Sequence, residues 1–162
     1  MNPQTRQAIS DGIVAAFRVA DPTSRSMALT VGRLMPADSD AWFVQAEGDE
    51  VAVYVLFGSA IHEVRGKRVA PPPENVPPPM ARAACSYRVL KVTPDATFSC
   101  NVTQTESGDG SEVKEIDEVW KFDLGAGCTI EIACKPPLPA GNHRFAVALV
   151  AAINARQTDP AA

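Results

Sequence analysis

The chain has 162 residues, of which 46% are hydrophobic and 21% are charged, and this composition is ordinary for one folded domain. Disorder throughout and a membrane-spanning architecture are therefore excluded at this level. Lys and Arg total 15 against 19 Asp and Glu, so the net charge is −4, which disfavours nucleic acids and anionic membranes as partners because both attract a positive surface. The N-terminal apolar run is too short for a secretion signal, so we expect a cytoplasmic protein.

The first 22 residues predict one amphipathic helix followed by a linker. Ile9, Ile13 and Phe17 recur at the spacing of one helical face. The step into Pro22 is expected to end this helix, because the residue before a proline disfavours the helical conformation. We therefore expect a helix that packs against a larger body.

A first group of strands is predicted over residues 26–69. The segment 51–57 is rich in β-branched and aromatic residues, and a four-residue turn containing Gly48 precedes it, which is typical of a hairpin. Another strand follows after a short break at residues 58–59. The expected extended segments of this group are residues 26–35, 41–46, 51–57 and 60–65.

A proline-rich connection over residues 70–80 separates this group from a second one over residues 81–135. Six of its eleven residues are proline, which donates no amide hydrogen, so a stiff linker is expected there. Polar and apolar residues alternate along the second group, which indicates half-buried strands. A helix over residues 141–157 should close the chain, with Asn142 as a plausible N-cap and Phe145, Leu149 and Ile153 on its buried face.

Cysteines and histidines give no catalytic or metal signature. The two histidines, His62 and His143, are interpreted as a strand-surface residue and a neutral first-turn helix residue. No pair of cysteines has the C-x-x-C spacing of common zinc and redox motifs. We therefore assign no catalytic residue, no cofactor and no metal ligand, and we expect a non-enzymatic protein. The four cysteines are Cys85, Cys100, Cys128 and Cys134. They are expected to be small hydrophobic core residues. A metal site built from all four is the minority interpretation.

Two charged stretches are candidate partner-binding surfaces. One is a basic cluster beside the proline-rich connection, whose alternative interpretation is a solvated loop. The other is the acidic stretch over residues 106–118, which lacks the calcium-loop pattern and is either a solvated edge or a docking surface for a basic partner. The candidate residues are Arg65, Lys67 and Arg68 in the basic cluster, and Glu106, Asp109, Glu112 and Glu115 in the acidic stretch.

Three segments carry a resemblance to bacterial pleckstrin-homology-like (PH-like) domains. They are VAVYVLFGSAIHEVRG at 51–66, EVWKFDLGAGCTIEI at 118–132 and RFAVALVAAIN at 144–154. The order of elements resembles that family more than any single motif does. The resemblance implies an α+β fold with an antiparallel barrel, or two bent sheets, of about seven strands. It also implies a C-terminal capping helix, to which this chain adds an N-terminal helix.

The resemblance implies a scaffold that binds another protein, or a second copy of this chain. Eukaryotic members usually carry a tryptophan in the last helix, whereas Trp42 and Trp120 here lie in expected strands. The first hairpin turn contains Glu47, Asp49 and Glu50, which repel phosphates, so phosphoinositide binding is not expected.

Two alternatives to this scaffold interpretation remain open. One is a small acidic protein similar to secretion chaperones, which also combine terminal helices with an antiparallel sheet. Those proteins usually have a central helix, and the proline-rich connection takes that place in this chain. The other is a small-molecule binder or enzyme that uses Cys128 or Cys134 at the mouth of a barrel.

Overall fold

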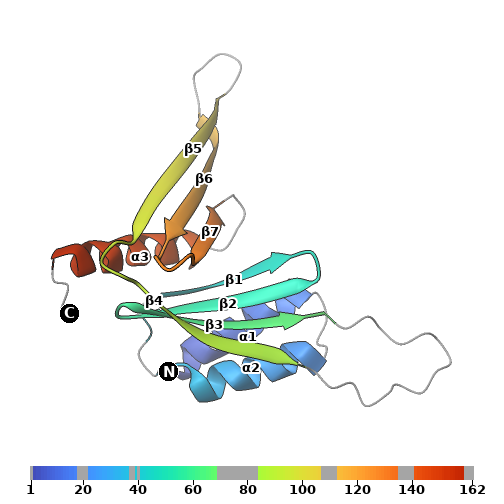
Figure 1. The fold of residues 1–162 in the computed structure, drawn as a ribbon. Helices are drawn as coiled ribbons and strands as arrows, with labels where there is room; N and C mark the ends of the chain where they lie inside the picture. Colours follow the sequence, from blue (N-terminus) through green and yellow to red (C-terminus); the bar gives the residue numbers. More distant parts are fainter. Residues whose placement is uncertain are drawn as a thin grey trace. The chain divides into compact units, whose positions relative to one another are not determined.

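The computed structural model describes residues 2–17, 22–36, 39, 41–68, 84–106, 113–134 and 141–158, with only the backbone given at 105–106 and 113–115. The chain divides into two compact units (Figure 1). The first comprises Met1–Phe57 and Ile61–Val89, and the second comprises Gly58–Ala60 and Leu90–Ala162. Each unit has its own antiparallel sheet and its own helical cover. The proline-rich connection, residues 70–80, lies outside the described residues.

Two helices cover one face of the first sheet (Figure 1). α1 (Pro3–Phe17) confirms the expected helix, and its apolar stripe is buried. α2 (Pro22–Leu34) lies where the sequence predicted an extended segment over 26–35, so that prediction was wrong. Proline is well tolerated at the first helical position, and buried Met27 and Val31 stand one turn apart on the inner face. The β-branched residues of this segment, Thr30 and Val31, lower helix propensity only weakly.

The first sheet is an antiparallel meander in which neighbouring strands are consecutive in sequence. Its strands are β1 (Ala41–Glu47), β2 (Glu50–Phe57), β3 (Ala60–Lys67) and β4 (Cys85–Lys91). Val51, Val53 and Val55 alternate along β2 and join the core beneath α1 and α2. Gly66 allows β3 to approach α2, because a Cβ there would stand 2.6 Å from the Met27 sulfur.

The second sheet contains β5 (Thr97–Glu106), β6 (Val113–Asp123) and β7 (Thr129–Cys134) in that order. All neighbouring strands are antiparallel, with Cys100 opposite Trp120 and Trp120 opposite Ile132. The strands β6 and β7 are joined by a tight turn in which Gly125, Ala126 and Gly127 all have positive φ. Because side chains alternate between faces, one face is apolar and the other polar. The apolar face carries Phe98, Cys100, Val102, Trp120, Phe122, Ile130, Ile132 and Cys134.

The C-terminal helix α3 (Gly141–Thr158) packs against β7. Phe145, Leu149 and Ile153 are fully buried, which confirms the predicted inner face. The side-chain amides of Asn142 and Gln157 each donate a hydrogen bond to a backbone carbonyl of the same unit, at 2.9 and 3.0 Å. Asn142 lies inside the first turn and bonds to the end of β7, so its predicted N-cap role was wrong. These two bonds attach both ends of the helix to the unit.

The fold is therefore mixed α+β, with two antiparallel sheets and a C-terminal helix, as the sequence predicted. Among the described strands, none of the four-stranded sheet pairs with one of the three-stranded sheet, so no closed barrel is present there. The described residues contain seven strands, and the first of them begins at residue 41 rather than at residue 26. Within the described part of the chain, no helix combines the length and the apolar character needed to cross a membrane.

Candidate functional site

The basic cluster predicted from the sequence does not converge on one site. The Arg65 guanidinium donates to Glu63 at 2.8 Å and to Glu50 at 2.9 Å. Arg68 donates to two backbone carbonyls instead, and Lys67 is exposed at the end of β3. The partners of the two arginines lie within the chain, so these residues stabilise the first unit. Their role in partner binding stays a prediction.

A buried carboxylate explains the placement of Arg65. Glu63 has only 1% of its side chain exposed, and both Arg65 and Arg88 form ion pairs with it. The Tyr54 hydroxyl accepts a hydrogen bond from Arg65 at 3.3 Å. Burial, and then the charge of Glu63, raise the pKa of Tyr54, while the hydrogen bond to Glu63 raises the pKa of Arg65. This network holds β2, β3 and β4 together through charge pairing.

The acidic stretch begins at the last residue of β5 and ends within β6. Asp109 and Glu112 lie outside the described residues. The backbone of Glu106 ends β5 and that of Glu115 lies in β6, and the side chains of both are outside the description. The candidate acidic residues therefore occur at the connection between these two strands, and their docking role stays a prediction.

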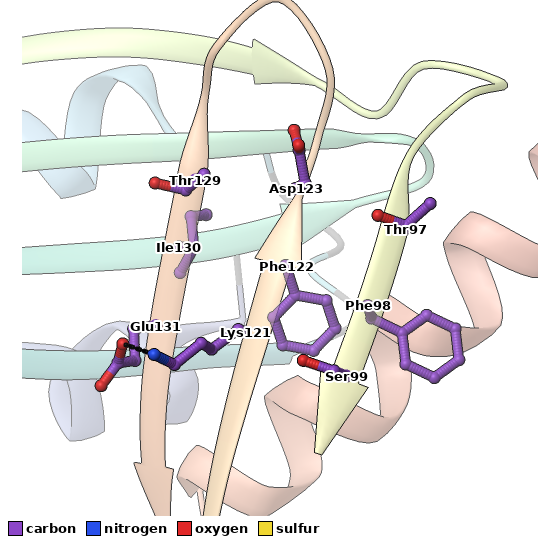
Figure 2. Close-up of a pocket in the computed structure, with 9 residues that line it drawn as sticks. All are labelled: Thr97, Phe98, Ser99, Lys121, Phe122, Asp123, Thr129, Ile130 and Glu131. Carbon is purple, nitrogen blue, oxygen red and sulfur yellow. Dashed lines mark ion pairs between the residues drawn. The ribbon is translucent and has the colours of Figure 1, made fainter. Parts of the chain in front are cut away.

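A shallow hollow of about 380 Å³ lies on the second sheet (Figure 2). Lys121 and Glu131 point toward each other across β6 and β7 and form an ion pair at 3.2 Å. Both are more than half exposed, so this pair contributes little to stability. The lining contains neither histidine nor cysteine, so it has no Ser–His or Cys–His pair. The lining residues are Thr97, Phe98, Ser99, Lys121, Phe122, Asp123, Thr129, Ile130 and Glu131.

The strand β5 forms one edge of the second sheet and carries exposed apolar side chains. Val102 is 60% exposed and Phe98 is 40% exposed, although both stand on the apolar face. Ile116 on β6, with 47% of its surface exposed, continues this patch. The buried apolar residues of this face lie on β6 and β7. Helix α3 therefore leaves the β5 side of the sheet open, within the described part of the unit.

The chain brings together three metal-ligating side chains that the sequence analysis did not connect. Glu118 on β6, Cys134 on β7 and His143 in the first turn of α3 each place one ligand atom within 4.8 Å of the others. Cross-strand pairing sets Glu118 directly opposite Cys134. The Nδ1 atom of His143 lies 2.9 Å from Glu118 Oε2, and the indole N–H of Trp120 donates to the same oxygen at 2.9 Å. We call these three residues the Cys–His–Glu cluster.

The cluster perturbs its own titratable groups. The hydrogen bond from Trp120, and to a smaller extent the one from His143, lowers the pKa of Glu118. Its carboxylate is therefore ionised at neutral pH. Burial is the main cause that raises the pKa of Cys134 to about 11, and the charges of Glu118 and Cys100 make smaller contributions in the same direction. Without a cation the Cys134 sulfur is therefore a thiol at neutral pH, which makes it a poor nucleophile.

The sequence contained only part of the information needed to find the cluster. Glu118 was grouped with the acidic stretch, and His143 was interpreted as an isolated helix residue. Glu118 lies sixteen positions before Cys134, and Cys134 lies nine positions before His143, so no local spacing motif exists. Side chains alternate between the two faces of a strand, and this alternation places Glu118 on the same face as Trp120. It was the one feature of the sequence that pointed toward the cluster.

Comparisons with known proteins give no relative for this chain. No protein-family model, no curated protein and no solved structure matches it. The function is therefore inferred from the geometry of the chain itself.

Proposed function

We propose that this chain is a non-enzymatic protein-binding module that captures an extended segment of another protein beside β5. The observation that carries the proposal is the exposed β5 edge, a ten-residue strand with Phe98 and Val102 open to solvent. Edge strands present unpaired backbone donors and acceptors, which serve as a template for an added strand. Exposed apolar side chains beside such an edge supply the contacts that give affinity.

The side chains of β5 indicate what kind of segment fits. Phe98 and Val102 share one face, while Ser99 and Asn101 point to the other, exposed face. An added strand with apolar side chains at alternate positions would extend the apolar face over β5 and keep its polar residues in water. We infer that the partner segment alternates in this way.

Charge adds a second selective feature. The end of β5 leads into the acidic stretch, and the chain as a whole carries a net charge of −4. Opposite charges speed association and fix the register of a bound segment. We therefore propose that the partner segment has basic residues at the end that lies near Glu106, which favours a different protein over a second copy of this acidic chain.

The grouping of four and three antiparallel strands before a C-terminal helix supports the PH-like scaffold proposed from the sequence. The secretion-chaperone alternative gains no support, because no described helix lies between α2 and α3. The enzyme alternative gains little at Cys134, because burial raises the pKa of that thiol to about 11 and nucleophilic attack requires a thiolate. An enzyme or small-molecule binder that uses Cys128 stays a prediction. Protein binding therefore remains the function with most support.

Selection from a random peptide library on the native chain tests the proposal. We expect the enriched peptides to alternate apolar and polar residues and to carry basic residues at one end. Val102→Lys should abolish their binding, because a lysine on an edge strand opposes pairing with an added strand. Val102 is 60% exposed, so this variant should keep its fold.

The matched control is Val89→Lys on β4, an edge strand of the first sheet, where the residue is 44% exposed. This variant should bind the selected peptides as the unmodified chain does. Equal loss of binding in both variants, or unchanged binding in Val102→Lys, would contradict the assignment of β5 as the docking edge.

A further inference from the structure

We propose that the Cys–His–Glu cluster is a binding site for a divalent transition metal ion of the zinc type. Its ligands are the Glu118 carboxylate, the Cys134 sulfur and a ring nitrogen of His143, which come from β6, β7 and α3. This proposal is independent of the protein-binding function proposed above. The site would attach the first turn of α3 to the sheet.

The spacing of the ligand atoms suits such an ion. In a tetrahedral zinc site the ligand atoms stand roughly 3.5 Å apart, given metal–ligand bonds of about 2.0–2.3 Å. The cluster atoms lie within 4.8 Å of one another, and the His143–Glu118 pair is at 2.9 Å. Coordination therefore requires shifts of roughly 1 Å, within the reach of side-chain rotation.

The donor set selects the class of metal. A sulfur, an imidazole nitrogen and a carboxylate oxygen together favour zinc, cobalt and similar ions over magnesium or calcium, which take oxygen ligands. Three protein ligands leave a fourth position for water, which is accessible because the His143 side chain is 56% exposed. We therefore expect a site with one solvent-derived ligand.

The groups around the ligands also fit a metal site. The Trp120 indole N–H donates a hydrogen bond to one carboxylate oxygen of Glu118. In metal sites, hydrogen bonds of this kind to the ligating groups fix the orientation of the ligands. On binding, the ion replaces the hydrogen bond between His143 and Glu118, and the imidazole proton moves to the other ring nitrogen. Cys134 releases its thiol proton to solvent, so one proton leaves for each ion bound.

Titration of the untagged chain with Co²⁺ tests the proposal. We expect one ion per chain and a thiolate-to-cobalt charge-transfer band in the near ultraviolet, which appears only if a cysteine is a ligand. Zn²⁺ should abolish this band by displacement and raise the melting temperature. Cys134→Ser should remove the band. His143→Gln should weaken binding at least about tenfold, since even losing a residue behind a metal ligand costs about 10–100-fold.

Matched controls separate the cluster from other residues of the same type. Cys128→Ser removes a thiol that lies six residues from Cys134, roughly 20 Å along an extended strand, and should leave the band unchanged. His62→Gln removes the chain's other histidine and should leave the affinity unchanged. His143 is exposed, so its variant remains folded and informative even if Cys134→Ser unfolds.

Absence of a charge-transfer band in the folded, reduced chain would overturn the proposal. So would a band that persists in Cys134→Ser, or equal affinity in His143→Gln and the unmodified chain. None of these results would affect peptide capture at β5, which is measured without metal.

Discussion

At the scale of single residues, close approach of elements explains where a small residue is required. A Cβ at Gly66 would stand 2.6 Å from the Met27 sulfur and 2.7 Å from the Thr23 methyl group. The methionine can rotate away, but the β-branched threonine on α2 has little freedom. We expect Gly66→Ala to lower the free energy of unfolding by about 1–3 kcal/mol, as overpacked cores do.

Gly32→Ala provides the contrast in a urea denaturation experiment. A Cβ at Gly32 would meet Arg6 at 3.7 Å, an ordinary contact, in the interior of α2. Alanine should raise the free energy of unfolding by about 0.5–1 kcal/mol there, because glycine loses more backbone entropy in a helix. Equal effects of the two substitutions would contradict the close packing of β3 on α2.

His62 predicts a pH dependence of stability. Burial lowers the pKa of His62 in the folded chain below its ordinary value of 6.5, and its Nδ1 lies 2.7 Å from the Tyr87 hydroxyl. The unfolded chain therefore binds a proton first as the pH falls through about 6.5, so the free energy of unfolding decreases below that pH. We expect urea denaturation at about pH 7.5 and about pH 5.5 to show this loss.

His62→Gln should reduce the pH dependence over the same range, since glutamine does not titrate. Denaturation of the variant and the unmodified chain under identical conditions isolates this contribution. An unchanged pH dependence in the variant would mean that other groups control stability in this window.

At the scale of elements, α3 completes the core of the second unit. Leu149 is fully buried, whereas Val147, two residues before it, is 49% exposed. We expect Leu149→Ala to lower the free energy of unfolding by about 2–5 kcal/mol, because it leaves a cavity. Val147→Ala should change it by less than about 0.5 kcal/mol, as substitutions at exposed positions do. Similar losses in the two variants, measured by thermal and chemical denaturation, would show that α3 packs differently.

Helices and strands were predicted correctly where the regular spacing of apolar residues continued over a long segment or ended at a clear turn. Helix α3 and the two predicted groups of strands were found because apolar spacing persisted and turns with glycine or proline separated the strands. The extended segment predicted over residues 26–35 was wrong, because most of it belongs to α2. In α2 the Thr30 hydroxyl donates to the Ser26 carbonyl at 2.9 Å, which satisfies the side chain inside a helix.

The candidate site was much less predictable than the elements. Glu118 and Cys134 become neighbours only through strand register, and His143 reaches them only after α3 packs on β7. Alternation assigns a residue to a face but does not say which residues face each other across strands. The exposure of Val102 was equally hidden, because it depends on which strands α3 covers.

At the scale of the whole molecule, charge limits the class of partner. The first hairpin turn presents Glu47 and Asp49 as exposed carboxylates, and Glu50 beside them pairs with Arg65. We expect no sedimentation of the chain with vesicles containing phosphoinositides, at low or physiological salt, because negative groups repel the headgroups. Binding that depends on the headgroup and weakens with salt would contradict this prediction.

Hydrogen exchange on the chain with and without a selected peptide is the most direct measurement of β5 capture. We expect amide exchange to slow along β5, where an added strand would pair with the backbone of this edge, while exchange along β4 and β1 is unchanged. Protection confined to β4, β1 or the helices, with β5 unaffected by a bound peptide, would contradict it.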